Sequence, residues 1–341
     1  MLILGVETSC DETAAALVRD GRHIVSDVVA SQIAVHSPYG GVVPELASRK
    51  HVENILPVIN EALRAGGVAL RHVDALAVTQ GPGLIGALLV GLSAAKGLAY
   101  AMKKPLIAVN HLEGHMEAAF VNAQRPDEPL VCLVVSGGHT ALYYVGADGT
   151  ARCVGSTRDD AAGEAYDKVA KLLGLGYPGG VVIDRLAQNG NPSAFSFPKA
   201  HLEKGSLDFS FSGIKTAVAY FVKKHGLPSE GFTTPYRLED LAASFQEAVV
   251  GVLVEKTMAA VERFQVRHVA VAGGVAANSR LRATLQEEAA YRRVNLYIPS
   301  IRYCTDNAVM IAMAGYRVWQ RRGFARDPLQ LDAVSRWLNG A

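Results

Sequence analysis

Two histidines in the run Asn110–His115 (NHLEGH) are spaced for metal binding. Residues four apart on a helix project from the same face, so His111 and His115 could both reach one ion. Two histidines make an incomplete site, and a pair of surface or core histidines is the plainer interpretation. Asp306, expected at a helix N-terminus, is a candidate third ligand through its oxygen, or alternatively an N-cap. Two histidines and one carboxylate would leave positions open for water or substrate.

The histidine pair does not fit the pattern of a zinc protease. That pattern is HExxH, with its glutamate directly after the first histidine. Here the acid is Glu113, two positions after His111. At roughly 100° per residue it lies about 200° around the helix from the metal face. The sequence therefore argues against protease chemistry.

Two glycine-bearing turns could receive a nucleotide. In VSGGHT (Val135–Thr140), Ser136, Gly137 and Gly138 could present backbone N–H groups to an anion, although an ordinary hairpin is equally compatible. In VAGGVAANSRLR (Val271–Arg282), the glycines at 273 and 274 would let a flat group lie against the backbone. Asn278 there could bind a hydroxyl or cap the following helix.

Acidic residues occur in two further segments. ETSCDET (Glu7–Thr13) lies between apolar strands, and Asp11 or Glu12 there could polarise a nucleophile; a solvated turn is the alternative. Asp167 lies in an expected helix, followed by YPGG and Asp184. These carboxylates could bind ribose or a polar substrate head, or could simply lie on solvated helix faces.

The hydrophobic pattern predicts the same element order twice. In the first half we expect three strands, at 2–8, 13–20 and 23–31. They are followed by helix 45–66, strand 74–80, helix 83–104, strand 105–111 and helix 111–120. In the second half the expected elements are strands 130–138, 140–147 and 151–157, helix 162–175, a less regular insertion at about 177–211, helices 212–226 and 237–264, strand 268–274, helix 278–293, strand 294–300 and helix 306–322. Three strands followed by alternating helices and strands predict two mixed α/β domains with a ligand cleft between them.

Bulk properties agree with a globular chain of two domains. The 341 residues are 50% hydrophobic and 19% charged, and the net charge of +2 gives no indication of a nucleic-acid partner. The four cysteines form no CxxC pair, which favours a reducing compartment, and the N-terminus does not resemble a secretory signal. The apolar stretch from Gly83 contains Lys96, so a buried or interface helix is expected rather than a membrane span.

Taken together and in order, these motifs resemble the tRNA adenosine threonylcarbamoyltransferase family in its bacterial form. The resemblance covers roughly Leu2 to Arg321 and is carried by ETSCDET, GGVVPELASRKH, GPGLIGALLVG, NHLEGH, VSGGHT, DDAAGEAYDKVAKLLGLGYPGG, DFSFSGIKT, AGGVAANSRLR and CTDNAVMIA. It implies a duplicated actin/Hsp70/sugar-kinase-like (ASKHA, ribonuclease H-like) fold. The implied lobes are 1–125 with 310–341, and 126–309.

The resemblance also implies an activity and its site. The threonylcarbamoyl group of threonylcarbamoyl-AMP would pass to N6 of adenosine 37 in tRNAs that read ANN codons, with release of AMP. One divalent metal, iron (Fe2+) or zinc, would be held by His111, His115 and Asp306. The adenylate, or ATP or ADP, would contact Val134, Val135, Ser136, Gly137, Gly138, Asp167, Gly180, Asp184 and Asn278. The implied setting is the cytoplasm, with a paralogous (TsaB-like) subunit and a P-loop ATPase (TsaE-like) as partners.

Some roles remain hypotheses. Glu12 or Asp11 would accept the proton of the amine. Lys223–Lys224, Arg292–Arg293 and Arg321–Arg322 are candidate tRNA contacts or solvated helix ends. The helices after Pro44 and Gly83 would form a partner surface. The rival functions are an O-sialoglycoprotein metalloprotease, another carbamoyltransferase or kinase of the superfamily, and a chaperone-like ATPase.

Overall fold

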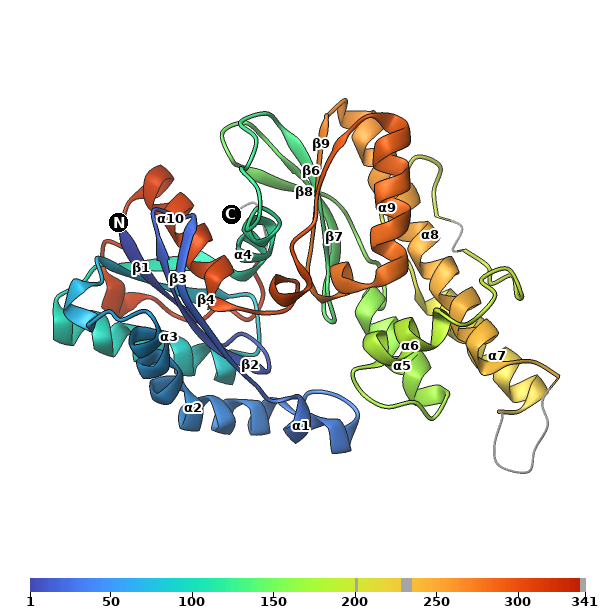
Figure 1. Ribbon diagram of the computed structural model, residues 1–341, viewed down its shortest axis with the longest axis horizontal. Coiled ribbons are helices and arrows are strands. Elements are labelled where there is room, and N and C mark those ends of the chain that lie inside the picture. The colour runs from blue at the N-terminus through green and yellow to red at the C-terminus, as the bar shows by residue number, and fades with distance from the viewer. Residues whose placement is uncertain (200–201, 228–234, 338–341) are drawn as a thin grey trace. The chain divides into compact units, whose positions relative to one another are not determined.

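The computed structural model describes residues 1–199, 202–227 and 235–337, and it divides into two compact units. The first comprises Met1–Asn122 and Thr305–Ala341, and the second comprises Ala123–Cys304. The junctions differ by a few residues from the lobes expected from the sequence, and Asp306 falls in the first unit with the histidines. Figure 1 shows the elements of each unit.

The first unit is a five-stranded sheet of order β3-β2-β1-β4-β5. Its strands are β1 (Leu2–Glu7), β2 (Glu12–Arg19), β3 (His23–Ser31), β4 (Ala75–Gly81) and β5 (Leu106–Asn110). β1 pairs antiparallel with β2 and parallel with β4, and β4 pairs parallel with β5. β1 is buried along its whole length, as expected for a central strand covered on both faces.

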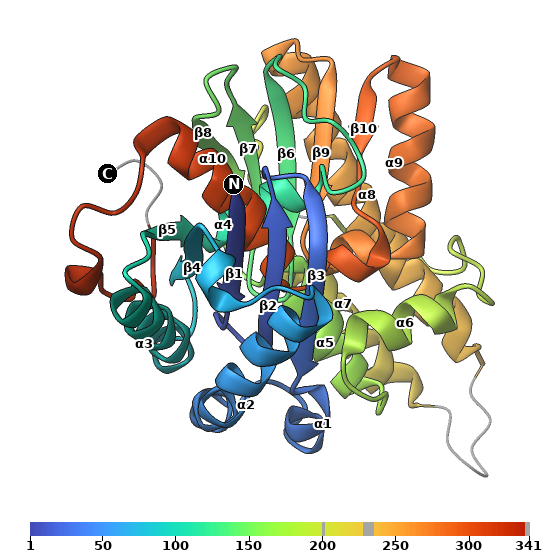
Figure 2. The same ribbon diagram turned by 60° about the vertical axis from the view of Figure 1, so that its left-hand side comes forward.

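Helices cover both faces of this sheet (Figures 1 and 2). α2 (Pro44–Ala65) and α3 (Ile85–Met102) pack together on the face that receives Leu4 and Val6. α10 (Ala308–Arg322) and α4 (His111–Ala118) lie on the other face. A Cβ on Gly5 would lie 2.3 Å from the carbonyl oxygen of Ala308, so glycine is required for α10 to approach β1 this closely.

α3 is the apolar helix that could be mistaken for a membrane span. By length and composition it is able to cross a bilayer, although core helices of globular proteins pass the same test. Here α3 packs on α2 and β4, and the ammonium group of Lys96 donates to the carbonyl of Leu331. The expectation of a packed helix rather than a membrane span therefore fits the structure.

The second unit repeats the topology of the first. Its sheet has the order β10-β9-β6-β7-β8, with β6 (Leu130–Val135), β7 (Thr140–Val145), β8 (Ala151–Ser156), β9 (His268–Ala272) and β10 (Asn295–Tyr297). As in the first unit, the first strand is central, antiparallel to the second and parallel to the fourth. This confirms the repeat of architecture expected from the sequence.

The helices of the second unit are α5 (Ala162–Leu172), α6 (Gly179–Ala187), α7 (Ser212–His225), α8 (Leu238–Phe264) and α9 (Ser279–Arg292). The sequence predicted a less regular segment at about 177–211, but α6 lies within it. Its two glycines and nearby prolines hid a short helix whose apolar side, including Ile183, packs into the core. A second short helix, α1 (Ile33–His36), interrupts the expected loop before α2.

Candidate metal centre and nucleotide site

The histidine pair and Asp306 meet in the first unit. α4 begins at His111, directly after β5, because the side chain of Asn110 caps it by accepting from the backbone N–H of Leu112 at 2.8 Å. Asp306 precedes α10, whose N-cap is Asn307 rather than Asp306. The capping alternative for Asp306 is therefore wrong, since its neighbour performs that role.

The geometry of the three side chains suits one metal ion. Asp306 Oδ1 lies 3.1 Å from His115 Nε2 and 3.6 Å from His111 Nε2. The ligand atoms of the three residues all lie within 4.8 Å of one another. Metal–ligand bonds of about 2.0–2.2 Å separate neighbouring donors by about 3–3.5 Å, which these distances match.

The electrostatics of the site favour a cation. Both ring nitrogens of His115 are buried, and among the described residues neither has a hydrogen-bond partner. Although burial alone would lower it, the carboxylates of Asp306 and Glu7 raise the pKa of His111 to about 9. A buried, unpartnered imidazole beside a carboxylate is the donor set expected of a metal site.

Glu113 points away from this site. Its carboxylate lies 3.4 Å from the guanidinium of Arg321 on α10. The predicted misplacement of Glu113 for protease chemistry is confirmed. Because Glu113 lies about 200° around α4 from the metal face, no zincin-type base is present at this position.

The first hairpin is more buried than a solvated turn. Glu12 begins β2 and is only 9% exposed; Oε1 accepts from Ser31 Oγ at 2.9 Å, and Oε2 has no partner among the described residues. Burial raises the pKa of Glu12 to about 8. Burial also raises the pKa of Asp11, and the charge of Asp306 acts on both carboxyls in the same direction. The interpretation as a solvated turn is therefore wrong for Glu12.

In the second unit the glycine turns converge at the carboxyl ends of parallel strands. The turn after β6 is closed by Ser136 N, which donates to His139 O at 2.8 Å, and Gly137 and Gly138 are exposed. Gly273, with φ of +95°, follows β9, and a Cβ there would lie 2.4 Å from the carbonyl of Val135. Open α/β sheets bind ligands at this edge. The side chains of Val134 and Val135 are fully buried, so only their backbone could contact a ligand.

A third loop joins this edge through α5. Gly163 N donates to Ser136 O at 3.2 Å, and a Cβ on Gly163 would lie 2.6 Å from that oxygen. The N-terminus of α5 is thereby held against the turn after β6. Helix N-termini and successive turn amides attract anions, and in this unit the two features lie side by side at one edge of the sheet.

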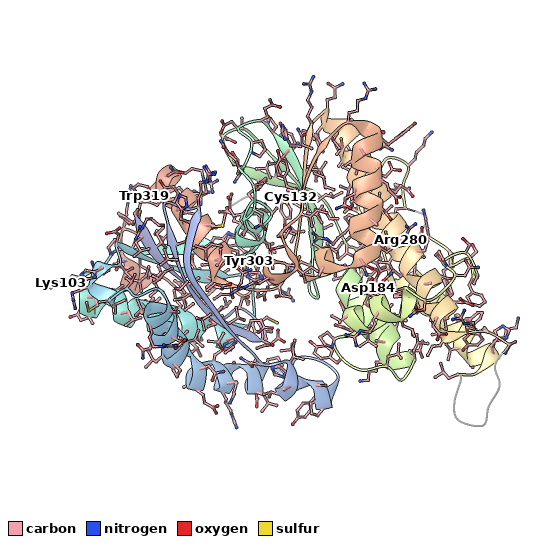
Figure 3. The ribbon with its side chains drawn as sticks, viewed as in Figure 1. Lys103, Cys132, Asp184, Arg280, Tyr303 and Trp319 are labelled. Carbon is pink, nitrogen blue, oxygen red and sulfur yellow. The ribbon has the colours of Figure 1, made fainter. Side chains whose placement is uncertain are left out.

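The remaining candidates lie on α5, α6 and α9. Asp167 accepts from Gly179 N at 2.7 Å, which places Gly180 at the start of α6. Asp184 on α6 accepts from Ser279 Oγ at 2.8 Å, and Figure 3 shows it with Arg280 on neighbouring helices. Asn278 caps α9 by accepting from Leu281 N at 2.9 Å.

Several residues around these sites were not singled out from the sequence. Asn278 Nδ2 donates to Gln246 Oε1 at 2.7 Å, which fixes the orientation of its amide. Glu7 contacts His111 Nδ1 at 3.1 Å. A charged residue at the end of the apolar run LILGVE was an available signal for Glu7, whereas Gln246, within a long apolar helix, gave none.

Comparisons with known proteins agree with this arrangement. A sequence model of the family described as tRNA N6-adenosine threonylcarbamoyltransferase matches residues 23–313. The protein of that name from Syntrophobacter fumaroxidans is 67% identical over 99% of this chain and 100% of its own length. The one from Geobacter sulfurreducens is 58% identical, over 99% of this chain and 97% of its own length.

Solved structures show the fold. Full-length HypF, in a phosphate- and nucleotide-bound form, superposes with a TM-score of 0.63 at 13% identity, over 95% of this chain and 47% of its own. The activator of 2-hydroxyisocaproyl-CoA dehydratase from Clostridium difficile gives 0.53 at 15% identity, over 93% of this chain and 94% of its own. These are ASKHA-type, actin-like folds. With the family match over most of its length, the chain belongs to the family of tRNA N6-adenosine threonylcarbamoyltransferases.

Proposed function

We propose that this protein transfers the threonylcarbamoyl group of threonylcarbamoyl-AMP to N6 of adenosine 37 in tRNAs that read ANN codons, releasing AMP. The observation that carries the proposal is the His111–His115–Asp306 group, which lies within the residues 23–313 that the family model matches. An exocyclic adenine amine is a weak nucleophile, because its lone pair is delocalised into the ring. Its acylation therefore requires an activated donor, and an acyl adenylate is one.

His111 and His115, each through Nε2, and Asp306, through Oδ1, would hold the metal. Two histidines and one carboxylate with open positions are the ligands of non-haem iron, which we propose as the native metal; zinc is the alternative that these ligands allow. When bound, the ion would supply Lewis acidity toward a carbonyl or phosphate oxygen.

The second unit would bind the adenylate. Amides of Ser136, Gly137 and Gly138 would hold the phosphate, which gains charge as the acyl group leaves. The backbone of Val134 and Val135 would line the same edge. Asp167, Gly180, Asp184 and Asn278 would bind the nucleoside, and the Gln246–Asn278 hydrogen bond of 2.7 Å would orient the amide.

Glu12 is the better candidate of the two acids for accepting the amine proton. A general base works best when its pKa lies near the operating pH, and burial raises the pKa of Glu12 to about 8. Its Oε2 is buried without a partner among the described residues, so it can receive a proton without breaking a hydrogen bond. The charge of Asp11 would then help to raise the pKa of Glu12.

tRNA would be the acceptor, and contacts to its phosphates would make binding fall steeply with salt. Of the candidate basic pairs, Arg292 is already paired with Glu288 and Glu262, and Arg321 with Glu113. Lys223 and Lys224, in the last turn of α7, are therefore the stronger candidates.

The paralogous subunit would dock on α2 and α3 of the first unit. Val52 and Leu56 on α2, and Ile85 and Leu89 on α3, are apolar but between 43% and 65% exposed. Their spacing of four places each pair on one helical face, and α2 and α3 pack side by side. A helix-bundle contact would cover this face. A P-loop ATPase would complete the cytoplasmic complex.

Single-turnover transfer tests the proposal. Radiolabelled threonylcarbamoyl-AMP is mixed with unmodified tRNA and the partner subunits, and the label on adenosine is followed for the wild type and for His111→Ala/His115→Ala. Label with the wild type alone is the expected result. If the wild type transferred no label to adenosine, the proposal would be overturned. If the variant transferred as much label as the wild type, the metal centre would have no role in the reaction.

A further inference from the structure

The carboxylate of Glu7 is fully buried beneath the metal centre. Glu7 ends β1, and its exposure is 0%. A buried carboxylate is costly unless it is paired and hydrogen-bonded. Its presence at the end of an otherwise apolar central strand therefore requires a compensating interaction.

Three donors surround this carboxylate. Thr79 Oγ1 donates to Oε2 at 2.6 Å, and the backbone N–H of Ser9 donates to Oε1. His111 Nδ1 lies 3.1 Å from Oε2. The parallel pairing of β1 with β4 brings Thr79 to Glu7, and the pairing of β4 with β5 brings His111, which follows β5. Glu7 is thus held rigidly by the sheet.

We infer that Glu7 is a positioning residue of the metal centre: its carboxylate accepts the Nδ1 proton of His111 and so commits Nε2 of that ring to the metal. The inference rests on the metal site of the proposed function. Both oxygens of Glu7 act as acceptors, Oε2 from Thr79 Oγ1 and Oε1 from the backbone N–H of Ser9, so the His111 nitrogen that faces Oε2 carries the proton. Carboxylate–histidine–metal arrangements of this kind fix the tautomer and increase the basicity of the ligand.

The neighbouring Ser9 does not change this assignment. Its hydroxyl lies 3.1 Å from the same nitrogen. A ring nitrogen carries at most one proton, and a hydroxyl can accept or donate, whereas the carboxylate can only accept. Ser9 therefore adapts to the tautomer that Glu7 imposes.

The two histidine ligands consequently differ. The ring of His111 is oriented by the contact of its Nδ1 with Glu7. The Nδ1 atom of His115 has no hydrogen-bond partner among the described residues. Of the two histidines, His111 is therefore the one whose ring a neighbouring side chain of this protein would orient.

Metal affinity provides the test. Zn2+ or Co2+ is titrated into the full chain, stripped of metal, against a chromogenic chelator, for the wild type, Glu7→Gln and Glu113→Gln. We expect Glu7→Gln to bind about 10–100-fold more weakly, the range found for lost outer-shell partners. Glu113, paired with Arg321 on the opposite side of α4, is the matched control, and its variant should bind like the wild type. The melting temperature of each metal-free variant separates a loss of fold from a loss of positioning.

A measurement on the wild type does not depend on a buried variant folding. In the zinc-loaded chain with 15N-labelled histidine, the ring of His111 should show a proton on Nδ1 and zinc bound through Nε2. Thr79→Val, which removes one donor to Glu7, should weaken metal binding less than Glu7→Gln does.

The outcomes are distinct. A wild type that binds no metal would overturn both the proposed metal site and this inference. A wild type that binds metal while folded Glu7→Gln binds equally well, or in which Nδ1 of His111 carries the metal, would overturn the inference alone.

Discussion

His115 Nε2 lies 3.1 Å from Asp306 Oδ1, joining a helix from the first third of the chain to a turn near its end. The contact depends on close packing of α4 against α10. A Cβ on Gly114 would lie 2.8 Å from Ile311 Cδ1, so the end of the Ile311 side chain would have to move to admit a larger residue. The metal centre is therefore a product of this helix pair.

Asp306→Asn should abolish stable metal binding while leaving the fold intact. The amide retains the shape of the carboxylate but loses its charge, so the ion would keep only two strong ligands. Because Asp306 would be a direct ligand, we expect a greater loss of affinity than the roughly 10–100-fold that removal of an outer-shell partner causes. Metal content after dialysis, measured by elemental analysis, checks this. Unchanged content would show that Asp306 is no ligand.

Glu12→Gln should alter the pH dependence of stability. The ordinary pKa of 4.5 is raised to about 8 in the fold, so between these values the folded state binds a proton that the unfolded state has lost. Stability should therefore fall as pH rises through this window, and the contribution of protonated Glu12 should be fully lost above about pH 8. The variant, with no proton to lose, should show a flatter melting temperature between pH 5 and 8.5. Parallel curves would contradict the buried state of Glu12.

The same variant tests the role of Glu12 in transfer. If Glu12 accepts the amine proton, the single-turnover rate of the wild type should rise with pH up to about 8, where the carboxylate becomes predominant. Glu12→Gln should lose about 10²–10⁴-fold, the usual contribution of a general base. Asp11→Asn serves as the comparison. A wild-type rate in Glu12→Gln would exclude this role.

Gly273→Ala should damage the turn after β9. Its φ of +95° disfavours a side chain, and the added Cβ would lie 2.4 Å from the carbonyl of Val135. We expect a loss of about 1–3 kcal/mol, as for other strained backbone positions, with weaker nucleotide binding. Gly213→Ala is the control, since a Cβ there meets nothing within 4 Å. Denaturant unfolding and calorimetric titration with AMP measure both effects.

Lys96→Met should loosen the C-terminal segment. Lys96 donates from within apolar α3 to Leu331 O, and Gln80 O accepts from Val334 N at 2.9 Å in the same segment. Loss of a hydrogen bond from a charged donor costs about 1.5–3 kcal/mol. Limited proteolysis should then cut after α10 sooner than in the wild type. Lys50→Met, which removes only an exposed pair with Glu53, should leave the cleavage rate unchanged.

The sequence by itself determined the elements and their order. Continuous apolar runs specified the buried strands, period-3.6 runs specified the helices, and Gly-rich segments specified the turns after β6 and β9, because these depend on residues close in the chain. The histidine spacing likewise specified a shared helical face, and the family motifs specified the candidate ligands. The helix α6 was missed because its glycines and flanking prolines resemble a loop locally, while burial of Ile183 stabilises it.

Tertiary structure decided which of these residues act together. Glu7 meets Thr79 and His111 only because β1, β4 and β5 pair in parallel, and Asp306 is freed from capping only because Asn307 takes that position. Whether Glu12 lies in solvent or in the interior was likewise decided by packing, which raises its pKa to about 8. Local patterns fix backbone conformation, but contacts between distant segments depend on how their buried surfaces fit together. A side chain loses its water, and its pKa shifts, only when those surfaces have packed.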